Sequence, residues 1–282
     1  MSIFKILILA IVQGAAELLP VSSSAHVIVA EKLMGLDPSA PEMTFLLVML
    51  HTGTMFAVLT YFWSRWRKLH LDFLKMTVVA TAVTGVVGFG LKLLLEKVLL
   101  PRILNTDSAE IEHMFKSLPL IAFALFCVGL LIVRAGREEL KEGSSALSVK
   151  QSVWIGLVQG LCLPFRGFSR SGATISAGLL CGVQRGLSED FSFALAVILT
   201  PPVLVHSLHR LMKASGLSLS EVGSQLGEIL LPGVLGMGLS FMAGLIALRW
   251  LSSWLEHGRW KYFGYYCLGA SGVVFCLGWA GF

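Results

Sequence analysis

Long apolar runs, separated by short polar segments, cover most of this chain. Runs of roughly 20 residues are long enough to cross a bilayer as helices. We predict such spans at 43–63, 73–95, 118–134, 190–211, 227–250 and 262–280. The fold class that this pattern predicts is an all-α polytopic membrane protein.

Two other apolar segments, 3–35 and 151–185, are interrupted by proline, glycine, serine and charged residues. Each is too broken to be one span and too apolar to be a soluble loop. Non-helical backbone at membrane depth is tolerated only where it is buried in protein or lines a polar cavity. We therefore expect each segment to form a re-entrant helical hairpin.

The two broken segments resemble each other. The first carries Gln13-Gly14, Pro20 and Ser22-Ser23-Ser24-Ala25, and the second carries Gln159-Gly160, Pro164 and Ser169-Arg170-Ser171-Gly172. Each precedes three predicted spans, so we expect two repeats, 1–135 and 136–282, within one membrane domain. Because each repeat has an odd number of spans, the second repeat runs in the opposite orientation to the first across the membrane. Broken helices that meet near the midplane of such an inverted pair form a binding site.

Composition supports this class. The hydrophobic share is 55%, the mean hydropathy is +0.79 and only 14% of the residues are charged, against about 25% in soluble domains. An ordinary soluble enzyme and a disordered chain are both excluded. The five cysteines lie in apolar stretches without ligand spacing, which predicts packing residues and neither disulfides nor a zinc site.

Lysine and arginine are unevenly divided between the predicted loops. Three segments that should share one side, 64–71, 134–150 and 249–261, hold ten of them, whereas the opposing loops hold five. We expect the richer side to be cytoplasmic, with both termini outside. The net charge of +5 then reflects topology and contact with anionic lipid, and no nucleic acid partner is expected.

Ionisable side chains inside apolar segments are costly and mark functional sites. Gln13 and Glu17 are four positions apart, on one face of a helix, where they could hold one hard cation or polarise one water. The alternative is a single buried carboxylate that is hydrogen-bonded for packing.

A second set, Pro20-Val21-Ser22-Ser23-Ser24-Ala25-His26, combines a helix break with serines that can cap the next helix. Such a helix start favours phosphate. A serine beside a histidine supplies a nucleophile and a base, or the histidine itself attacks or protonates the leaving oxygen. Plain N-capping is the alternative.

The third set is Gly167-Phe168-Ser169-Arg170-Ser171-Gly172-Ala173-Thr174. An arginine in such a break is costly unless it meets an anion, and its planar fork suits phosphate. The alternative is a structural salt bridge between Arg170 and Glu17. The two interpretations are compatible, because such a bridge could open to admit a diphosphate.

The other histidines carry weaker signals. The stretch His51-Thr52-Gly53-Thr54, at the start of a span, could face the same cavity in a supporting role. His206 and His209 are interfacial by position. Those in predicted loops carry no signal: His70, His113 and His257. The chain has no phosphate-binding loop, dinucleotide fingerprint or zinc signature, which argues against nucleotide-driven chemistry.

Together the three sets resemble the bacterial undecaprenyl-diphosphate phosphatases, the bacitracin-resistance family, over nearly the whole chain. The resemblance implies hydrolysis of undecaprenyl diphosphate to undecaprenyl phosphate and inorganic phosphate, with Mg²⁺ or Ca²⁺. It places the reaction on the outer side of the bacterial cytoplasmic membrane, where it recycles the lipid carrier for cell-wall synthesis.

The resemblance also assigns residues. Gln13 and Glu17 would hold the metal. The catalytic residues would be Glu17, Ser23, His26 and Arg170. Flanking polar residues are expected to bind the substrate: Ser22, Ser24, Ser169, Ser171, Gly172 and Thr174. One departure is Arg166, which stands where the family usually has proline, and this second cation is expected to tighten phosphate binding or alter the turn.

Two other functions fit parts of the pattern. An inverted repeat with a midplane site also suits a transporter or flippase of a polyprenyl phosphate lipid. A structural scaffold does not explain Glu17 and Arg170 in apolar surroundings. The expected partners are a polyprenyl diphosphate lipid and the bilayer, and a homodimer is possible.

Overall fold

The helices follow the hydrophobic pattern closely. The computed structural model describes residues 2–38, 40–68, 71–99, 117–139, 142–215, 222–255 and 259–281. Its helices are α1 (Ile3–Leu18), α2 (Ser23–Leu33), α3 (Pro41–Trp66), α4 (Leu71–Leu94), α6 (Leu118–Ala135), α7 (Val149–Cys162), α8 (Arg170–Leu180), α9 (Arg185–Ser215), α10 (Val222–Leu255) and α11 (Trp260–Trp279), with a π-helical turn, Leu95–Leu99, after α4. The predicted all-α class is confirmed.

Five helical stretches in the described part of the chain are long and apolar enough to cross a membrane. They are Glu42–Trp66, Leu71–Leu99, Leu118–Ala135, Arg185–Ser207 and Leu230–Arg249, and they coincide with five of the predicted spans. The sixth prediction, 262–280, falls on α11, which is helical but is not one of the five. Tryptophan, tyrosine and glycine occupy many positions of α11 that aliphatic residues occupy in the others.

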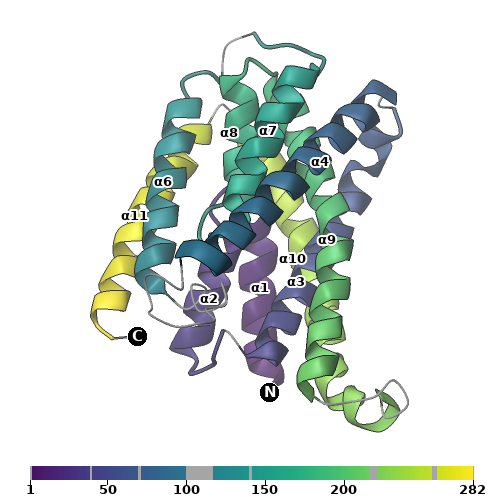
Figure 1. Cartoon of the computed structure of the whole chain (residues 1–282), viewed down its shortest axis with the longest axis vertical. Coiled ribbons are helices and arrows are strands. Elements are labelled where there is room, and N and C mark those ends of the chain that lie inside the picture. The colour runs from purple at the N-terminus through teal and green to yellow at the C-terminus, as the bar shows by residue number, and fades with distance from the viewer. Residues whose placement is uncertain are drawn as a thin grey trace.

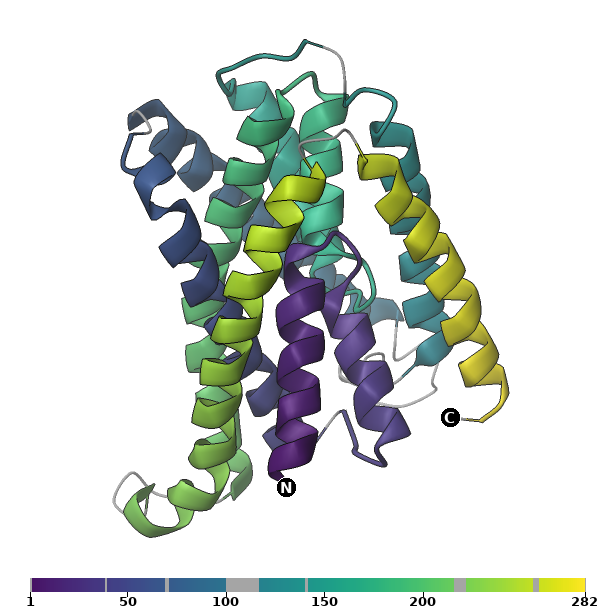
Figure 2. The ribbon, with the colours of Figure 1, turned by 180° about the vertical axis from the view of Figure 1, so that it is seen from behind.

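Each broken segment forms two short helices joined by a turn. In the first, α1 ends at Leu18 and Leu19 is extended, as expected for a residue before proline. In the second, Ser169 is the N-cap of α8, and its hydroxyl accepts a hydrogen bond from the backbone N–H of Gly172 at 3.2 Å. The two helix pairs enter from opposite ends of the molecule, and their turns meet in its middle (Figures 1 and 2).

Longer helices surround the two helix pairs. α6 packs along α11, α3 along α10, and α4 along α7, while α1 packs against α10. Figure 2 shows α1 and α2 between α10 on one side and α11 with α6 on the other. The turns are therefore enclosed by protein at mid-depth, as backbone without helical hydrogen bonds requires in a membrane.

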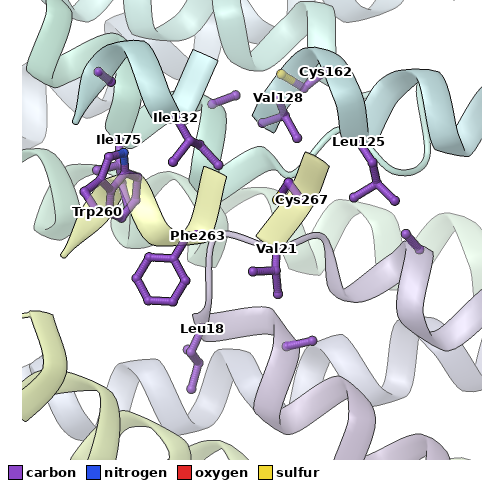
Figure 3. Packing of buried hydrophobic residues seen from close by; sticks show 14 of the residues in the cluster. Leu18, Val21, Leu125, Val128, Ile132, Cys162, Ile175, Trp260, Phe263 and Cys267 are labelled. Carbon is purple, nitrogen blue, oxygen red and sulfur yellow. The ribbon is translucent and has the colours of Figure 1, made fainter. Parts of the chain in front are cut away.

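The largest apolar cluster fixes these turns in place. Leu18 and Val21 from the first turn meet Ile132 of α6 and Cys267 of α11 in this cluster (Figure 3). Trp260 is 1% exposed, and its indole N–H donates to the Ser176 hydroxyl at 3.2 Å. Side chains packed this closely gain many van der Waals contacts, which drive helix association in membranes, so the cluster is a main source of rigidity around the turns.

The helix ends next to the basic segments lie together. The C-terminal ends of α3 and α6 and the N-terminal end of α11 are at one end of the molecule, opposite both chain termini (Figure 1). Ion pairs lie there as well: Arg185 of α9 pairs with Glu139, which follows α6, and with Glu189 of its own helix, and the half-exposed Arg65 of α3 pairs with Asp190 of α9 at 2.9 Å. All five cysteines are free thiols.

Candidate active site

A cavity of about 580 Å³ opens where the two turns meet α3, α4 and α9. Its charged and hydrogen-bonding wall includes Glu17, Ser23, His51, Lys92, Arg166 and Arg170. Its apolar wall includes Leu47, Val48, Phe89, Leu163, Leu199 and Val203. A ligand with a charged head and a hydrocarbon tail matches this division.

Glu17, in the last turn of α1, is at the centre of the polar wall. Its Oε1 accepts a hydrogen bond from Nη2 of Arg170 at 2.7 Å. Its Oε2 accepts hydrogen bonds from the Gln13 amide at 2.9 Å and from the Ser23 hydroxyl, and lies 3.3 Å from Nε2 of His51. The Glu17 side chain is only 13% exposed, so these contacts compensate a carboxylate that is largely removed from water.

Local structure explains how these groups converge. Gln13 and Glu17 share a face of α1, and the break at Pro20 turns the chain so that Ser23, the first residue of α2, returns to the end of α1. Arg170 is the first residue of α8. The N-termini of α2 and α8 thus both face this point, and helix N-termini favour anions.

The charge of the cavity is positive. Three cationic side chains line it, Arg166, Arg170 and Lys92, against the single carboxylate of Glu17. Lys92 also pairs with Glu96 at 3.7 Å. A cavity with this excess of cations suits a ligand with several negative charges, such as a diphosphate.

His51 contributes more directly than its sequence position indicated. Its Nδ1 lies 2.7 Å from the carbonyl oxygen of Leu47, and because a carbonyl only accepts, Nδ1 carries the proton. Nε2 lies toward Oε2 of Glu17 at 3.3 Å and donates to it in the imidazolium form, in which both ring nitrogens carry a proton. The sequence suggested a supporting role in the same cavity, whereas the structure brings His51 into contact with the central carboxylate.

His26 faces away from this cluster. Its Nδ1 lies 2.8 Å from the carbonyl oxygen of Ser22, and its Nε2 lies 2.7 Å from the hydroxyl of Tyr266 on α11, with the two rings stacked. By the same tautomer argument, Nδ1 donates to Ser22 and Nε2 accepts from Tyr266. The structure does not bring His26 to the cavity wall, and no pattern in the sequence pointed to Tyr266.

The predicted substrate-binding residues divide into two groups. Four line the cavity: Ser22, Ser24, Ser169 and Ser171. The other two, Gly172 and Thr174, lie behind the wall. Thr174 is 1% exposed, and its hydroxyl bonds the carbonyl of Arg170 at 2.9 Å and the hydroxyl of Ser192 at 2.6 Å. Of the weaker histidine candidates, His206 lines the cavity, and His70, His113 and His257 lie outside the described residues.

Two backbone positions hold the turns in unusual conformations. Gly167 has φ +99°, and a Cβ there would come within 2.6 Å of the carbonyl oxygen of Ile121. Ser22 also has positive φ, 65°, a strained conformation for a residue other than glycine. The strain at Ser22 is held by the surrounding structure at the point where the serines enter the cavity.

The oxygen atoms near Glu17 suit a hard cation. Across the described ranges there is no group of three His, Cys, Asp or Glu side chains that could hold a metal ion. However, Oε1 of Gln13 is buried and accepts no hydrogen bond from the part of the chain that is described. A carboxylate, an amide oxygen and the oxygens of a bound phosphate are the ligands that Mg²⁺ and Ca²⁺ prefer. Gln13 and Glu17 therefore fit such an ion.

Similarity to known proteins extends over nearly the whole chain. The family model for bacitracin resistance protein BacA matches residues 6–273. Undecaprenyl-diphosphatase 2 of Acinetobacter baylyi is 53% identical over 284 residues, which cover 98% of each chain. Undecaprenyl-diphosphatase 2 of Burkholderia orbicola and undecaprenyl-diphosphatase 1 of Burkholderia pseudomallei are each 34% identical over 300 residues, covering 99% of this chain and 97% of theirs.

Proposed function

We propose that Glu17 and its neighbours form the active site of this chain, which belongs to the bacitracin resistance protein BacA family. The chain is an undecaprenyl-diphosphatase with multiple membrane helices. This position of the active site is supported by one observation: a single cationic cavity brings Glu17 together with the Ser23 hydroxyl and the Arg170 guanidinium. The reaction converts undecaprenyl diphosphate and water into undecaprenyl phosphate and inorganic phosphate.

The substrate binds with its diphosphate among the cations and its hydrocarbon chain along the apolar wall. Backbone and hydroxyl groups at the N-termini of α2 and α8 contact the phosphoryl oxygens, since both helices start at the cavity. The tail runs past Leu47, Phe89 and Val203 and continues sideways into the lipid between helices.

Ser23 is the nucleophile in this proposal, and Glu17 is its base. The Ser23 hydroxyl donates to Oε2 of Glu17, so the proton passes to Glu17 as Oγ attacks the terminal phosphorus. The bond from that phosphorus to the bridging oxygen breaks. Undecaprenyl phosphate leaves without needing a proton, because a phosphate monoester is already a stable anion.

Hydrolysis of the phosphoserine completes the cycle. Water attacks the phosphorus, the bond to Oγ breaks, and Glu17 returns the proton to Ser23. Inorganic phosphate leaves with the oxygen of the water. Arg170 stabilises the negative charge on the phosphoryl oxygens in both steps, as positioned cations do in phosphoryl transfer.

Glu17 and Gln13 would hold a Mg²⁺ or Ca²⁺ ion against the diphosphate, and the ion would supply further neutralisation of phosphoryl charge. His51 orients Glu17 from the α3 side. The contacts of His26 with Ser22 and Tyr266 support a positioning role, in which His26 holds the strained turn that presents Ser23.

For the membrane arrangement we propose two inverted repeats, 1–135 and 136–282, each with one re-entrant hairpin. The opposite entry of α1–α2 and α7–α8 (Figures 1 and 2) supports this arrangement. We also propose that the end next to the basic segments is cytoplasmic. The cavity then serves the outer side of the bacterial cytoplasmic membrane.

Phosphate release by the purified protein in detergent tests the function. Detergent removes the sidedness of a membrane, so a transporter or flippase would release no phosphate from a polyprenyl diphosphate, whereas this enzyme should release it continuously. Ser23→Ala and Arg170→Ala should abolish release. Ser144→Ala, at the far end of the molecule, is the matched control and should retain parental activity.

A further inference from the structure

Lys92 is a cation of the cavity wall to which the proposed reaction gives no role. It lies in the last turn of α4, and its side chain is 45% exposed. α4 also contributes Gly88 and Phe89 to the wall. Phe89 is three positions from Lys92, so both side chains lie on one face of α4, about one helical turn apart. Lys92 is therefore next to the part of the wall that is assigned to the hydrocarbon tail.

α4 and the reacting groups lie on opposite sides of the cavity. α4 passes in front of α1 in Figure 1, and α1 lies in front in the reverse view of Figure 2. The cavity between them is lined by Glu17 and Ser23 from the first hairpin and by Lys92 from α4. A diphosphate whose terminal phosphorus is at Ser23 therefore directs its other phosphoryl group, which carries the tail, across the cavity toward α4.

The ion pair of Lys92 does not prevent it from binding a phosphate. Its Nζ lies 3.7 Å from Oε1 of Glu96, which belongs to the π-helical turn after α4. This distance is longer than that of a hydrogen bond, and ion pairs four positions apart on a partly exposed helix contribute little to stability. The flexible four-carbon stem of lysine allows its ammonium group to exchange Glu96 for another anion.

The lipid-linked phosphoryl group gains negative charge during the proposed reaction. When the bond from the terminal phosphorus to the bridging oxygen breaks, its electron pair stays on that oxygen, which departs with undecaprenyl phosphate. Arg170 is placed at the terminal phosphoryl group, because it contacts Glu17 beside the Ser23 hydroxyl. A cation placed where charge grows stabilises the transition state more than the ground state. Lys92 is on the side of the cavity where this charge appears.

We propose that Lys92 binds the lipid-linked phosphoryl group of the substrate and neutralises the charge that grows on it as undecaprenyl phosphate departs. The inference rests on the proposed function and extends it, because it divides the cavity into two phosphate subsites. The terminal phosphoryl group binds at Ser23 and Arg170, and the lipid-linked phosphoryl group binds at Lys92. The two products, inorganic phosphate and a prenyl phosphate, are then held by different residues.

Inhibition by each product separates the two subsites. Farnesyl diphosphate is the substrate at a fixed concentration of Mg²⁺, and inorganic phosphate or farnesyl phosphate is added as the inhibitor. Lys92→Gln should raise the inhibition constant of farnesyl phosphate about tenfold and lower kcat/KM about tenfold, with the inhibition constant of inorganic phosphate within about twofold of the parent. Lys92→Arg keeps the positive charge and should stay within about threefold of the parent in all three quantities.

The control for these variants is on the same helix. Lys75→Gln makes the same substitution near the other end of α4, where Lys75 forms an exposed pair with Asp72 at 3.2 Å. It should change neither inhibition constant and leave kcat/KM at the parental value.

Glu96→Gln distinguishes substrate binding from a structural ion pair. If Lys92 and Glu96 only stabilise the end of α4, Glu96→Gln and Lys92→Gln should change the inhibition constant of farnesyl phosphate in the same direction, which would overturn the inference. If Lys92 binds the lipid-linked phosphate, removal of the competing carboxylate should lower this constant about twofold, opposite to the effect of Lys92→Gln. Glu96→Gln retains Lys92, so it tests the inference even if Lys92→Gln does not fold.

Three further results for Lys92→Gln would overturn the inference. An equal rise in both inhibition constants would mean that the cavity has no separate subsites. A rise for inorganic phosphate alone would place Lys92 at the terminal phosphoryl group, and unchanged constants would mean that Lys92 binds neither product. Each of these results leaves the proposed function in place, whereas a parent protein that releases no phosphate overturns the proposed function itself.

Discussion

Nη2 of Arg170 lies 2.7 Å from Oε1 of Glu17, although 153 positions separate the two residues in the chain. The contact joins the start of α8 to the end of α1 and connects the turns of the two hairpins. It is the salt bridge that the sequence offered as an alternative to phosphate binding. In the proposed reaction the substrate competes with Glu17 for Arg170, and a guanidinium that turns to the phosphate would leave Glu17 freer to accept the proton of Ser23.

Replacing Arg170 with lysine keeps the charge and removes the fork. We expect kcat/KM to fall by at least about tenfold, which corresponds to about 1.4 kcal/mol of transition-state stabilisation. Arg170→Ala should be worse. Phosphate-release kinetics measure both, and near-parental kinetics of Arg170→Lys would mean that Arg170 acts only as a point charge or a structural partner.

Removing the Ser23 hydroxyl should stop the covalent route. Ser23→Ala is expected to lower kcat by about a thousandfold or more, as loss of a nucleophile does in other hydrolases. Ser24→Ala, which changes the neighbouring hydroxyl in the same turn, should cost only a few-fold. Rapid quenching with substrate labelled in the terminal phosphate should trap labelled parent protein, and a fully active Ser23→Ala contradicts the assignment.

Hydrolysis should depend on a divalent cation, because the donors near Glu17 are oxygens. Exhaustive chelation is expected to abolish phosphate release, and Mg²⁺ or Ca²⁺ should restore it without any need for Zn²⁺. Gln13→Ala should raise the concentration of Mg²⁺ needed for half-maximal activity. Full activity after chelation would exclude the metal role.

A variant of Tyr266 tests whether His26 positions the turn or transfers a proton. Tyr266→Phe removes the hydroxyl that contacts Nε2 of His26 and leaves the contact with Ser22 intact. We expect activity within a few-fold of the parent and an unchanged profile of kcat against pH. A shift in one limb of that profile would instead assign His26 the proton-carrying role that the sequence suggested.

Gly167 should tolerate no side chain. Gly167→Ala forces a left-handed conformation on a residue with a Cβ and drives that Cβ against the carbonyl of Ile121. We expect a loss of about 1–3 kcal/mol of stability, measured as a lower midpoint of thermal unfolding in detergent. Gly182→Ala also has positive φ but meets no atom within 4 Å, so it should lose less.

Part of the candidate site could be predicted from the sequence, because some of its residue types are unusual in their surroundings. Glu17 and Arg170 stand out because charged side chains are rare in apolar segments, and Ser23 stands out because it follows a helix break. The fold class and five spans were predictable for a similar reason, since apolar runs of this length have few other uses.

The sequence could not show which side of each helix contacts its neighbours. A membrane helix is apolar on most sides, so the sequence could place His51 near the cavity but could not show that it contacts Glu17, and nothing in α11 indicates that Tyr266 contacts His26. The burial of Glu31, which is 1% exposed near the end of α2, could not be predicted either, because it precedes Lys32 near a helix end, where charge usually means exposure to water. Gly172 and Thr174 belong to the motif by sequence, but Gly172 packs against Ile132 and Thr174 bonds to Ser192, away from the cavity.

The two hairpins have a consequence for how the protein is made. Glu17 belongs to the hairpin that is synthesised first, whereas Arg170, which pairs with it, belongs to the hairpin that follows the first three long helices. When only the first half has been synthesised, Glu17 can therefore meet His51 of the same half but not the guanidinium of Arg170. The Glu17–Arg170 ion pair is completed late in translation, and a chain that stops before Arg170 retains the carboxylate without this partner.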